Sequence, residues 1–488
     1  MLDTGLLLVV ILASLSVMFL VSLWQQKIRE RLPPGPTPLP FIGNYLQLNM
    51  KDVYSSITQL SERYGPVFTI HLGPRRIVVL YGYDAVKEAL VDQAEEFSGR
   101  GELPTFNILF KGYGFSLSNV EQAKRIRRFT IATLRDFGVG KRDVQECILE
   151  EAGYLIKTLQ GTCGAPIDPS IYLSKTVSNV INSIVFGNRF DYEDKEFLSL
   201  LEMIDEMNIF AASATGQVKD SSSANCAYNQ QIIKVTQKLE DFMIEKVRQN
   251  HSTLDPNSPR NFIDSFLIRM QEEKYVNSEF HMNNLVMSSL GLLFAGTGSV
   301  SSTLYHGFLL LMKHPDVEAK VHEEIERVIG RNRQPQYEDH MKMPYTQAVI
   351  NEIQRFSNLA PLGIPRRIIK NTTFRGFFLP KGTDVFPIIG SLMTEPKFFP
   401  NHKDFNPQHF LDDKGRLKKN AAFLPFSIGK RFCLGDSLAK MELFLLLTTI
   451  LQNFRFKFPM NLEDINEYPS PIGFTRIIPN YTMSFMPI

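Results

Sequence analysis

The residues around Cys433 have the types and spacing of a metal-binding thiolate site. The segment Phe426–Gly435 reads FSIGKRFCLG, fits the pattern F-x-x-G-x-R-x-C-x-G, and leads into an apolar stretch that starts near Ser437. Glycines permit a tight turn around the sulfur, and a helix that follows directs its positive end toward a thiolate. We therefore expect a lowered pKa for the Cys433 thiol, which favours metal ligation. Arg431 is a permanent cation whose fork of donors suits a carboxylate.

The rest of the sequence predicts a mainly α-helical protein with a small β region to position this cysteine. Two long segments, Leu285–Lys313 and Leu438–Asn453, are apolar on most of their circumference, which is typical of helices buried within a large protein. Two short β-type runs, Pro66–Leu72 and Arg76–Leu80, are bounded by Gly or Pro turn signals. No repeat, low-complexity tract or composition shift divides residues 41–488, so we expect one catalytic domain there.

With the Cys433 motif leading into an apolar helix, the chain resembles a cytochrome P-450 essentially from end to end. It is most similar to the mammalian microsomal subfamily that hydroxylates coumarin and steroids such as testosterone. The resemblance implies a mostly helical fold with a small sheet, haem b as cofactor, and a thiolate ligand that favours cleavage of the O–O bond. It also implies a monooxygenase that inserts one atom of O2 into a lipophilic steroid or xenobiotic.

The resemblance assigns residues to the haem site. Cys433 is the ligand of the iron, and Arg127, Arg366 and Arg431 match residues that bind the haem. Many relatives carry tryptophan four residues before the first of these arginines, whereas this chain has Ala123. One propionate donor of the wider family is therefore absent.

Glu352 and Arg355 are three residues apart and share one face of a helix, so they can pair. By spacing alone they would form a solvated surface pair worth roughly a few tenths of a kcal/mol. The resemblance makes them the family's structural E-x-x-R element, completed by Asn406, Pro407 and Phe410.

The segment Ala295–Ser299 departs from the family pattern on the distal side of the haem. Relatives have [AG]-G-x-[DE]-T there, an acid and an alcohol that help to deliver protons. Ser299 keeps a hydroxyl and Thr297 is a second candidate catalytic hydroxyl, whereas Gly298 replaces the acid and cannot relay a proton. Two glycines in one helical turn also predict a local distortion, at a cost of roughly 1 kcal/mol each relative to alanine. We hypothesise that water in the space left by the carboxylate relays protons through Ser299, with poorer coupling.

The missing acid leaves two alternatives to a coupled monooxygenase open. One is a peroxide-driven haem-thiolate enzyme or isomerase, because such relatives dispense with the proton-delivery pair. The other is a poorly coupled or inactive haem-binding pseudoenzyme, for which Gly298 is the only sequence argument.

Apolar residues at the family's pocket-lining positions predict a compact pocket for a lipophilic substrate. They are Phe106, Phe110, Leu117, Phe210, Phe294, Ala295, Ala360, Ile364 and Phe474. The segment Gln217–Gln230 roofs the substrate channel in relatives; here it is shorter and lacks their Pro-Gly-Pro stretch. Within it, residues 219–225 are polar and predict a flexible surface loop.

The N-terminal region predicts a membrane anchor with a basic flank over residues 1–31 and a proline-rich hinge over residues 32–40. Gly5–Trp24 contains no charge and is long enough to cross a hydrocarbon core as a helix. Three basic residues follow it: Lys27, Arg29 and Arg31. The positive-inside tendency then places the catalytic domain on the cytosolic side, and the resemblance places it at the endoplasmic reticulum.

The net charge and the number of cysteines exclude a nucleic-acid binder and a disulfide-stabilised scaffold. The net charge of +2 gives no field of the kind that a nucleic-acid binder uses, and four cysteines are too few for a disulfide scaffold. The chain has no nucleotide-binding fingerprint of its own, so electrons must come from another protein. The resemblance implies NADPH-cytochrome reductase, with cytochrome b5 as a second candidate. Lys124, Arg125 and Arg128 are candidates for a basic patch that docks an acidic donor.

Overall fold

The computed structural model describes Ser16 and residues 32–118, 120–138, 142–213, 227–273, 278–458, 465–472 and 475–488. The predicted anchor, residues 1–31, lies outside this part of the chain except for Ser16. Residues 214–226, which include the predicted loop at 219–225, and Phe474 of the predicted pocket also lie outside it.

Helices make up most of the described chain, which confirms the predicted fold class. The longer helices are α2 (Val53–Tyr64), α6 (Val120–Asp136), α7 (Arg142–Gly161), α8 (Ser170–Phe186), α9 (Lys195–Ala212), α10 (Ala227–Ser252), α11 (Phe262–Glu272), α12 (Met282–Lys313), α13 (Pro315–Val328), α14 (Pro344–Ser357) and α16 (Asp436–Asn453). The short ones are α3 (Tyr83–Lys87), α4 (Pro104–Phe110), α5 (Gly114–Leu117), α15 (Ile389–Met393), η1 (Tyr45–Gln47), η2 (Glu88–Asp92), η5 (Tyr337–Lys342), η6 (Pro407–Phe410) and η7 (Gly429–Arg431).

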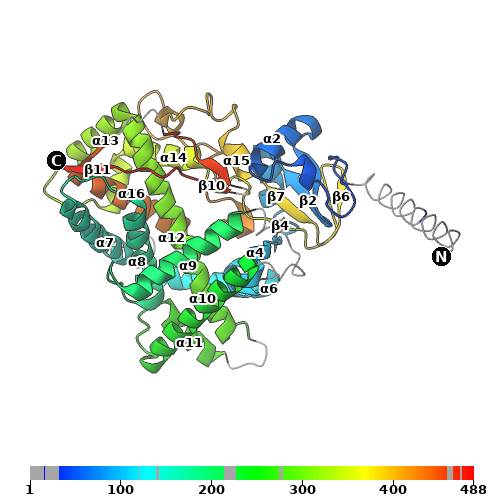
Figure 1. Ribbon diagram of the computed structural model, residues 1–488, viewed down its shortest axis with the longest axis horizontal. Helices are drawn as coiled ribbons and strands as arrows, with labels where there is room; N and C mark the ends of the chain where they lie inside the picture. The colour runs from blue at the N-terminus through cyan, green and yellow to red at the C-terminus, as the bar shows by residue number, and fades with distance from the viewer. Residues whose placement is uncertain are drawn as a thin grey trace, which may run out of the picture.

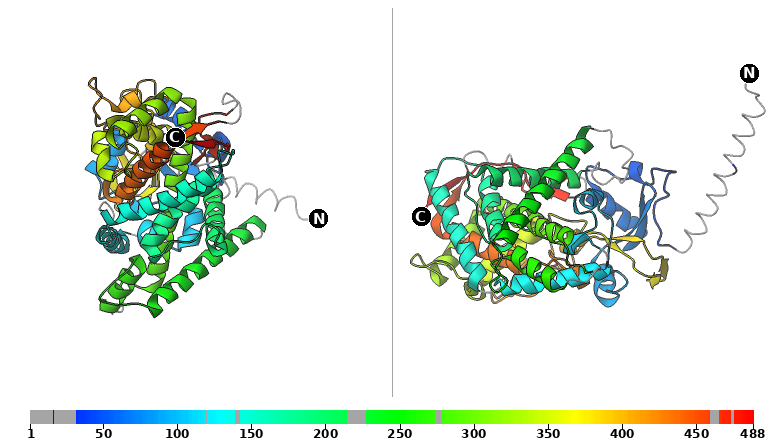
Figure 2. Two further views of the ribbon diagram at one scale, coloured as in Figure 1. Left: turned by 90° about the vertical axis from the view of Figure 1, so that its left-hand side faces the viewer. Right: turned by 90° about the horizontal axis from the view of Figure 1, so that it is seen from below.

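The five-stranded sheet lies at one end of the molecule and most of the long helices at the other, where β11 also lies (Figures 1 and 2). A five-stranded sheet has the order β1-β2-β7-β4-β3. Its strands are β1 (Val67–Leu72), β2 (Arg75–Leu80), β7 (Asp384–Pro387), β4 (Arg366–Arg367) and β3 (Gly99–Arg100). Three two-stranded ladders join β5 (Thr372–Phe374) to β6 (Phe377–Leu379), β8 (Phe454–Lys457) to β11 (Ser484–Pro487), and β9 (Ser470–Ile472) to β10 (Thr475–Ile477).

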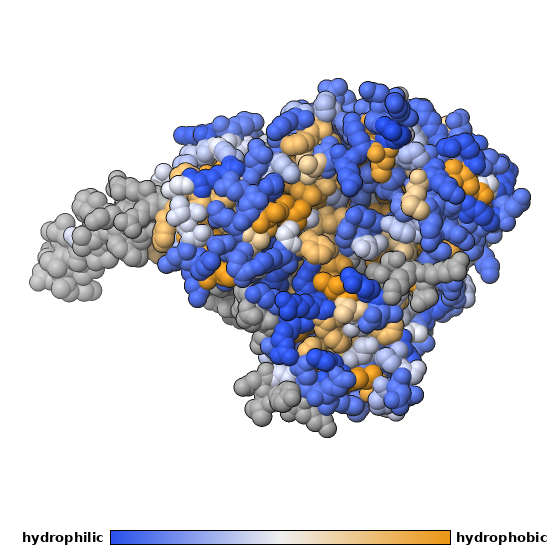
Figure 3. Space-filling view, turned by 180° about the vertical axis from the view of Figure 1, so that it is seen from behind, coloured by the Kyte–Doolittle hydropathy of each residue, from blue (hydrophilic) through white to orange (hydrophobic). Residues whose placement is uncertain are grey.

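The two strands predicted from sequence pair with each other at the start of the sheet. β1 and β2 are antiparallel, with Val67 opposite Leu80, and β2 then pairs in parallel with β7. The apolar run Ile77–Leu80 is fully buried, as expected for a strand with neighbours on both sides. Figure 3 shows one face of the molecule, where polar residues predominate and apolar ones form scattered patches.

The long helix α12 lies at the centre of the helical part and packs against α5, α8, α10, α14 and α16. Within the described chain it is the one helix long and apolar enough to span a membrane, but most of its apolar stretch is buried within the protein. It is therefore a core helix, as predicted. It continues as one helix from Met282 to Lys313, so Gly296 and Gly298 do not interrupt it.

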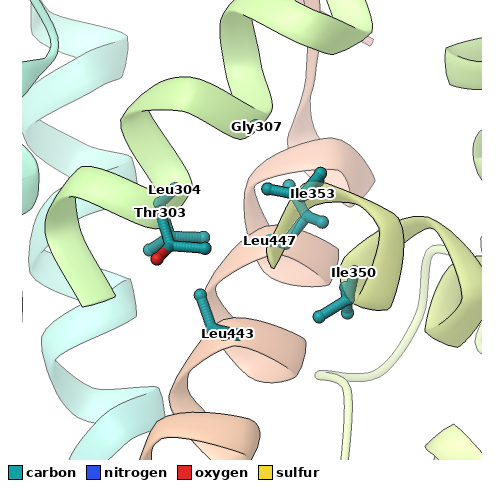
Figure 4. A pocket seen from close by; sticks show the side chains of 7 residues that line it. All are labelled: Thr303, Leu304, Gly307, Ile350, Ile353, Leu443 and Leu447. Carbon is teal, nitrogen blue, oxygen red and sulfur yellow. The ribbon is translucent and has the colours of Figure 1, made fainter. Parts of the chain in front are cut away.

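Helices α12, α14 and α16 meet around a small apolar void of about 10 Å³ (Figure 4). Seven residues from the three helices line it: Thr303, Leu304, Gly307, Ile350, Ile353, Leu443 and Leu447. A space of this size and polarity holds no water, so the junction behind the distal helix is tightly packed.

A buried histidine ties α12 to the C-terminal part of the chain. His306 Nδ1 lies 2.7 Å from Ser357 Oγ, and its Nε2 lies 2.7 Å from the Glu467 carbonyl oxygen. Burial lowers the pKa of His306 from 6.5 to about 4. The folded protein therefore holds this ring neutral.

This predicts a specific acid sensitivity. Between pH 6.5 and about 4 the unfolded chain protonates His306 while the folded protein does not, so the free energy of unfolding falls as pH decreases. The loss reaches about 3 kcal/mol below pH 4. Urea unfolding of His306→Gln should show a shallower pH slope in this window than wild type. The exposed His251→Gln on α10 is the control, and an equal slope in the two variants would contradict the prediction.

Candidate active site

Cys433 lies in a loop between η7 and α16 whose shape depends on two glycines. Its backbone N–H donates a hydrogen bond to the Phe426 carbonyl oxygen at 2.8 Å. Gly429 has φ of 78°, and a Cβ there would lie 1.9 Å from the Leu90 carbonyl oxygen, so no side chain fits. A Cβ on Gly435 would lie 4.0 Å from Cys433 Sγ. The first glycine therefore allows the loop to pack against η2, and the second leaves room beside the sulfur.

The Cys433 side chain is solvent-accessible, yet it lies in a recess of the protein. Burial raises the pKa of its thiol, and this outweighs the lowering by the Gly435 N–H and by Arg127. Asp436, in the first turn of α16, raises the pKa further. The prediction of a lowered thiol pKa is therefore wrong for the protein by itself. A metal ion deprotonates a thiol that coordinates it, so ligation does not need an intrinsically acidic cysteine.

Four arginines from four separate elements converge beside this cysteine. They are Arg100 on β3, Arg127 on α6, Arg366 on β4 and Arg431 in η7. Burial, and then repulsion from the other guanidinium groups, lowers the pKa of Arg366 to about 9 and of Arg431 to about 10. The same causes lower the pKa of Arg100 well below its ordinary value. The cluster concentrates positive charge in a recess, so an anion there would be strongly favoured.

Backbone carbonyl groups hold the arginines in place. Arg431 donates from Nε to the Ser98 carbonyl oxygen at 3.1 Å and from Nη2 to that of Ser118 at 3.3 Å. Arg127 donates to the Phe432 carbonyl oxygen, and its guanidinium lies 5.3 Å from the centroid of the Phe432 ring. The arginines are thus fixed next to the cysteine loop, and no carboxylate among the described residues forms an ion pair with them.

The cluster retains donors for a ligand. The Nη1 atoms of Arg100, Arg366 and Arg431 are buried and have no hydrogen-bond partner in the described part of the chain. Buried donors without partners are costly, so they point to an acceptor that belongs to the site. Haem b carries a metal that thiolates ligate and two carboxylates that guanidinium groups bind. The donor set of Cys433 and the arginines therefore fits this cofactor.

The predicted pair Glu352–Arg355 lies fully buried on α14. Arg355 donates from Nε to Glu352 Oε2 and from Nη2 to Oε1, each at 2.7 Å. Arg355 also donates to the carbonyl oxygens of Met393, His402 and Asp404 at 2.8–3.1 Å. The pair therefore fixes the segment after α15, which leads toward the cysteine loop, and it is no surface ion pair.

Glu352 also binds the start of η6. The Asn406 N–H donates to Glu352 Oε1 at 2.8 Å, as the E-x-x-R prediction requires, and Pro407 begins η6. Sequence reasoning missed His409, whose Nδ1 lies 3.1 Å from the same oxygen. Phe410 packs its ring against the rings of Phe399 and Phe423.

On the distal helix α12, the two predicted hydroxyl residues point in different directions. Ser299 is exposed, as is Ala295 one turn earlier, so this face of an otherwise buried helix is open. Thr297 is buried, and its hydroxyl donates to Ser178 Oγ on α8 at 3.3 Å. Thr297 therefore serves helix packing, whereas Ser299 faces accessible space.

The two glycines of α12 also differ in their surroundings. A Cβ on Gly296 would lie 2.4 Å from the side chain of Ile181 on α8, so close helix packing requires this glycine. A Cβ on Gly298 would meet only Asn208 Nδ2 of α9, at 3.6 Å, which is an ordinary contact. Space for a side chain therefore exists at Gly298.

Aromatic residues from α4 and α12 predicted to line the substrate pocket lie close together. The rings of Phe106 and Phe110 lie 6.2 Å apart, and that of Phe110 lies 6.2 Å from the ring of Phe294. Phe110, Leu117 and Phe210 are buried in one apolar cluster with Phe294. The structure thus brings these five residues into one apolar region.

The other described members of the predicted pocket are solvent-accessible. Ala295 lies on the open face of α12, and Ala360 and Ile364 follow α14 in the loop that leads to β4. The neighbouring Leu359 carbonyl oxygen accepts a hydrogen bond from Thr475 Oγ1 at 2.7 Å, so this loop lies against β10.

The predicted basic patch on α6 is partly neutralised. Arg125 pairs with Glu273 at 2.9 Å and with Glu279 at 2.5 Å, and Lys124 lies 3.6 Å from Glu95. Arg128 lines a groove of about 620 Å³ between α6 and α11.

Comparison with known proteins identifies the class of this site. The family model described as Cytochrome P450 matches residues 33–485. The chain is 97% identical over 492 aligned positions to Cytochrome P450 2A2 of Rattus norvegicus, with both chains fully covered. It is 80% identical to Cytochrome P450 2A12 of Mus musculus and 65% identical to Cytochrome P450 2A13 of Homo sapiens, again over the full length of each.

These matches agree with the cysteine motif, the arginine cluster and the buried E-x-x-R pair. The predicted family is confirmed, and the relatives come from mammals. The chain belongs to the cytochrome P450 family and is a P450 monooxygenase.

Proposed function

We propose that this protein is a haem-thiolate monooxygenase of the endoplasmic reticulum membrane that hydroxylates lipophilic substrates, steroids above all. Its electrons come from NADPH through NADPH-cytochrome reductase, with cytochrome b5 as a second donor. The observation that carries the proposal is the accessible thiol of Cys433 beside buried guanidinium donors that lack partners. Anchored by residues 1–31 and spaced by the hinge at 32–40, one catalytic domain of residues 41–488 faces the cytosol.

Each site residue has a task in this proposal. Cys433 supplies the thiolate ligand, and Arg127, Arg366 and Arg431 hold the propionates. Arg100, which sequence reasoning missed, joins them through its free Nη1. Bound haem supplies the activation of O2 and the electron storage that no side chain provides. Arg125 and Arg128 lie on the surface where an acidic electron donor would dock.

The apolar residues around α4 and α12 suit a substrate without charge. Phe110 and Phe294 are buried, and Phe106 packs against the same cluster. Burying a steroid against such rings gains about 25 cal/mol for each Å² of apolar surface removed from water. Testosterone and coumarin are the first substrates to test, with NADPH oxidation and hydroxylated product measured in the presence of the reductase. No product from either, with an intact haem-thiolate spectrum, would contradict the proposal.

Proton delivery on the distal side rests on Ser299 in this proposal, because Gly298 carries no acid. Ser299 Oγ donates to the Ala295 carbonyl oxygen at 2.8 Å, so its lone pairs are left to accept a hydrogen bond from water.

Introducing an acid should therefore change coupling. Gly298→Glu fits sterically, and its carboxyl can take the place of water beside Ser299. We expect the hydrogen peroxide released per NADPH consumed to fall about 3- to 10-fold, which is less than the roughly 10²- to 10⁴-fold that a positioned acid can contribute, because water and Ser299 already deliver protons in the wild type. Gly298→Ala is the control for loss of the glycine alone. Equal ratios of hydrogen peroxide to NADPH in wild type and Gly298→Glu would contradict the proposal that Ser299 delivers protons without an acid.

A further inference from the structure

A carboxamide on α9 faces the place where this chain lacks an acid. A Cβ on Gly298 would lie 3.6 Å from Asn208 Nδ2, so this amide group borders the space beside the glycine. Asn208 is half-buried and makes no side-chain hydrogen bond to any residue that the structure describes. Figure 1 shows α9 crossing α12. The amide therefore has two donors and an acceptor to offer to water in this space.

A carboxyl group lies one turn earlier on the same face of α9. Asp205 precedes Asn208 by three residues, which corresponds to a rise of about 4.5 Å along the helix. Within the described chain it forms no ion pair and no side-chain hydrogen bond. Its side chain is accessible to water, and the protein around it raises the pKa of its carboxyl group by partial desolvation.

The other acids of α9 do not share this combination. Glu196 pairs with Lys246 at 2.9 Å, and Glu206 accepts a hydrogen bond from Gln231. Glu202 is exposed, as Asp205 is, but it lies a turn further from Asn208. Asp205 is thus the acid of α9 that shares a face with Asn208 and pairs with no residue that the structure describes.

We infer that α9 supplies the proton-delivery groups that α12 lacks. Asn208 is a positioning residue that holds water in the space beside Gly298. Asp205 passes protons from solvent to this water, and Ser299 passes them on toward the distal side of the haem. This inference rests on the proposed monooxygenase function.

The chemistry fixes what the relay must deliver. Hydroxylation consumes the substrate, O2, two electrons and two protons, and yields the alcohol and water. The electrons come from NADPH through the reductase, and both protons come from solvent by way of Asp205. When protons arrive too slowly at the correct oxygen, O2 leaves as hydrogen peroxide, which takes up the same two electrons and two protons. Peroxide per NADPH at saturating substrate therefore reports on the relay and not on substrate affinity.

The first experiment measures this ratio in full-length protein with reductase, NADPH and testosterone. Asp205→Asn and Asn208→Leu should each raise the peroxide released per NADPH about 3-fold or more. Glu202→Gln removes the same charge from the same helix and should leave the ratio unchanged. In the Gly298→Glu background, Asp205→Asn should have no further effect, because α12 again carries an acid. Asn208→Ala serves as a second variant if Asn208→Leu yields no haem-thiolate spectrum.

A second measurement does not depend on turnover. Infrared spectra of the ferric protein, recorded over a pH titration, should contain the C=O band of a protonated carboxyl group that Asp205→Asn removes. The band should persist in Glu202→Gln. A wild type that makes hydroxylated product while Asp205→Asn and Asn208→Leu keep its peroxide ratio would overturn the relay. A wild type that makes no product would instead count against the proposed function, and the infrared band would still decide whether Asp205 holds a proton.

Discussion

Replacing Glu352 with glutamine should strongly destabilise the fold and lower the yield of haem-loaded protein. The carboxylate is fully buried against Arg355, which is 2% exposed, and it also accepts hydrogen bonds from the segment that leads into η6. Glutamine keeps the shape but removes the charge, so the guanidinium is left buried and uncompensated. Breaking a buried pair in this way costs about 3–5 kcal/mol, against a total stability of roughly 5–15 kcal/mol.

The measurement is the yield of haem-loaded protein and the urea midpoint of what can be purified. Glu326→Gln is the matched control, because Glu326 pairs with Arg331 at 3.2 Å on the surface, where both side chains are more than half exposed. An exposed pair of this kind contributes about 0–1 kcal/mol. A midpoint for Glu352→Gln as high as that of the control would show that the buried pair does not stabilise the fold.

Arg366→Met should have opposite effects on the protein with and without haem. Arg366 is 2% exposed, and repulsion from Arg431 and Arg127 adds to the cost of burying its charge. Without haem, the apolar side chain of similar size relieves this cost, so the apoprotein should gain about 1–3 kcal/mol. With haem, a charge-assisted hydrogen bond worth about 1.5–3 kcal/mol is lost, so haem should dissociate about 10- to 100-fold faster.

Haem transfer to excess apomyoglobin gives the dissociation rate, and urea unfolding gives the stability of the apoprotein. Arg331→Met, on the surface, is the control for replacement of an arginine alone. If Arg366→Met destabilises the apoprotein and leaves the rate of haem dissociation unchanged, then Arg366 stabilises the β-sheet and does not bind the haem propionates.

Local patterns in the sequence predict much of this site. The glycines around Cys433, the i, i+3 spacing of Glu352 and Arg355, and the apolar stretch that became α12 were all visible without the fold. Two residues along a helix correspond to a rotation of about 200°, so their side chains point to nearly opposite sides. The spacing alone therefore places Thr297 and Ser299 on different faces of α12. Thr297 accordingly lies on the buried face that packs against α8, and Ser299 on the open face.

The residues that sequence reasoning missed are those brought in by long-range packing. Arg100 reaches the cluster because β3 pairs with β4, which carries Arg366. His409 reaches Glu352 from 57 positions away in the chain. Asn208 borders Gly298 because α9 crosses α12, and no local spacing indicates this. The thiol pKa was mispredicted for a similar reason, since burial of Cys433 outweighs the neighbouring donors.

The carbon-monoxide difference spectrum of the reduced protein tests the assignment of Cys433 most directly. A thiolate ligand shifts the Soret band of carbon-monoxide-bound haem to the long wavelength for which P450 is named, because the axial ligand sets the electronic state of the iron. We expect this band in wild type and in Cys163→Ser, where an exposed cysteine outside the site is replaced. Cys433→Ser should lose it completely. A Cys433→Ser protein that retains the band, or a haem-loaded wild type that lacks it, would contradict the account.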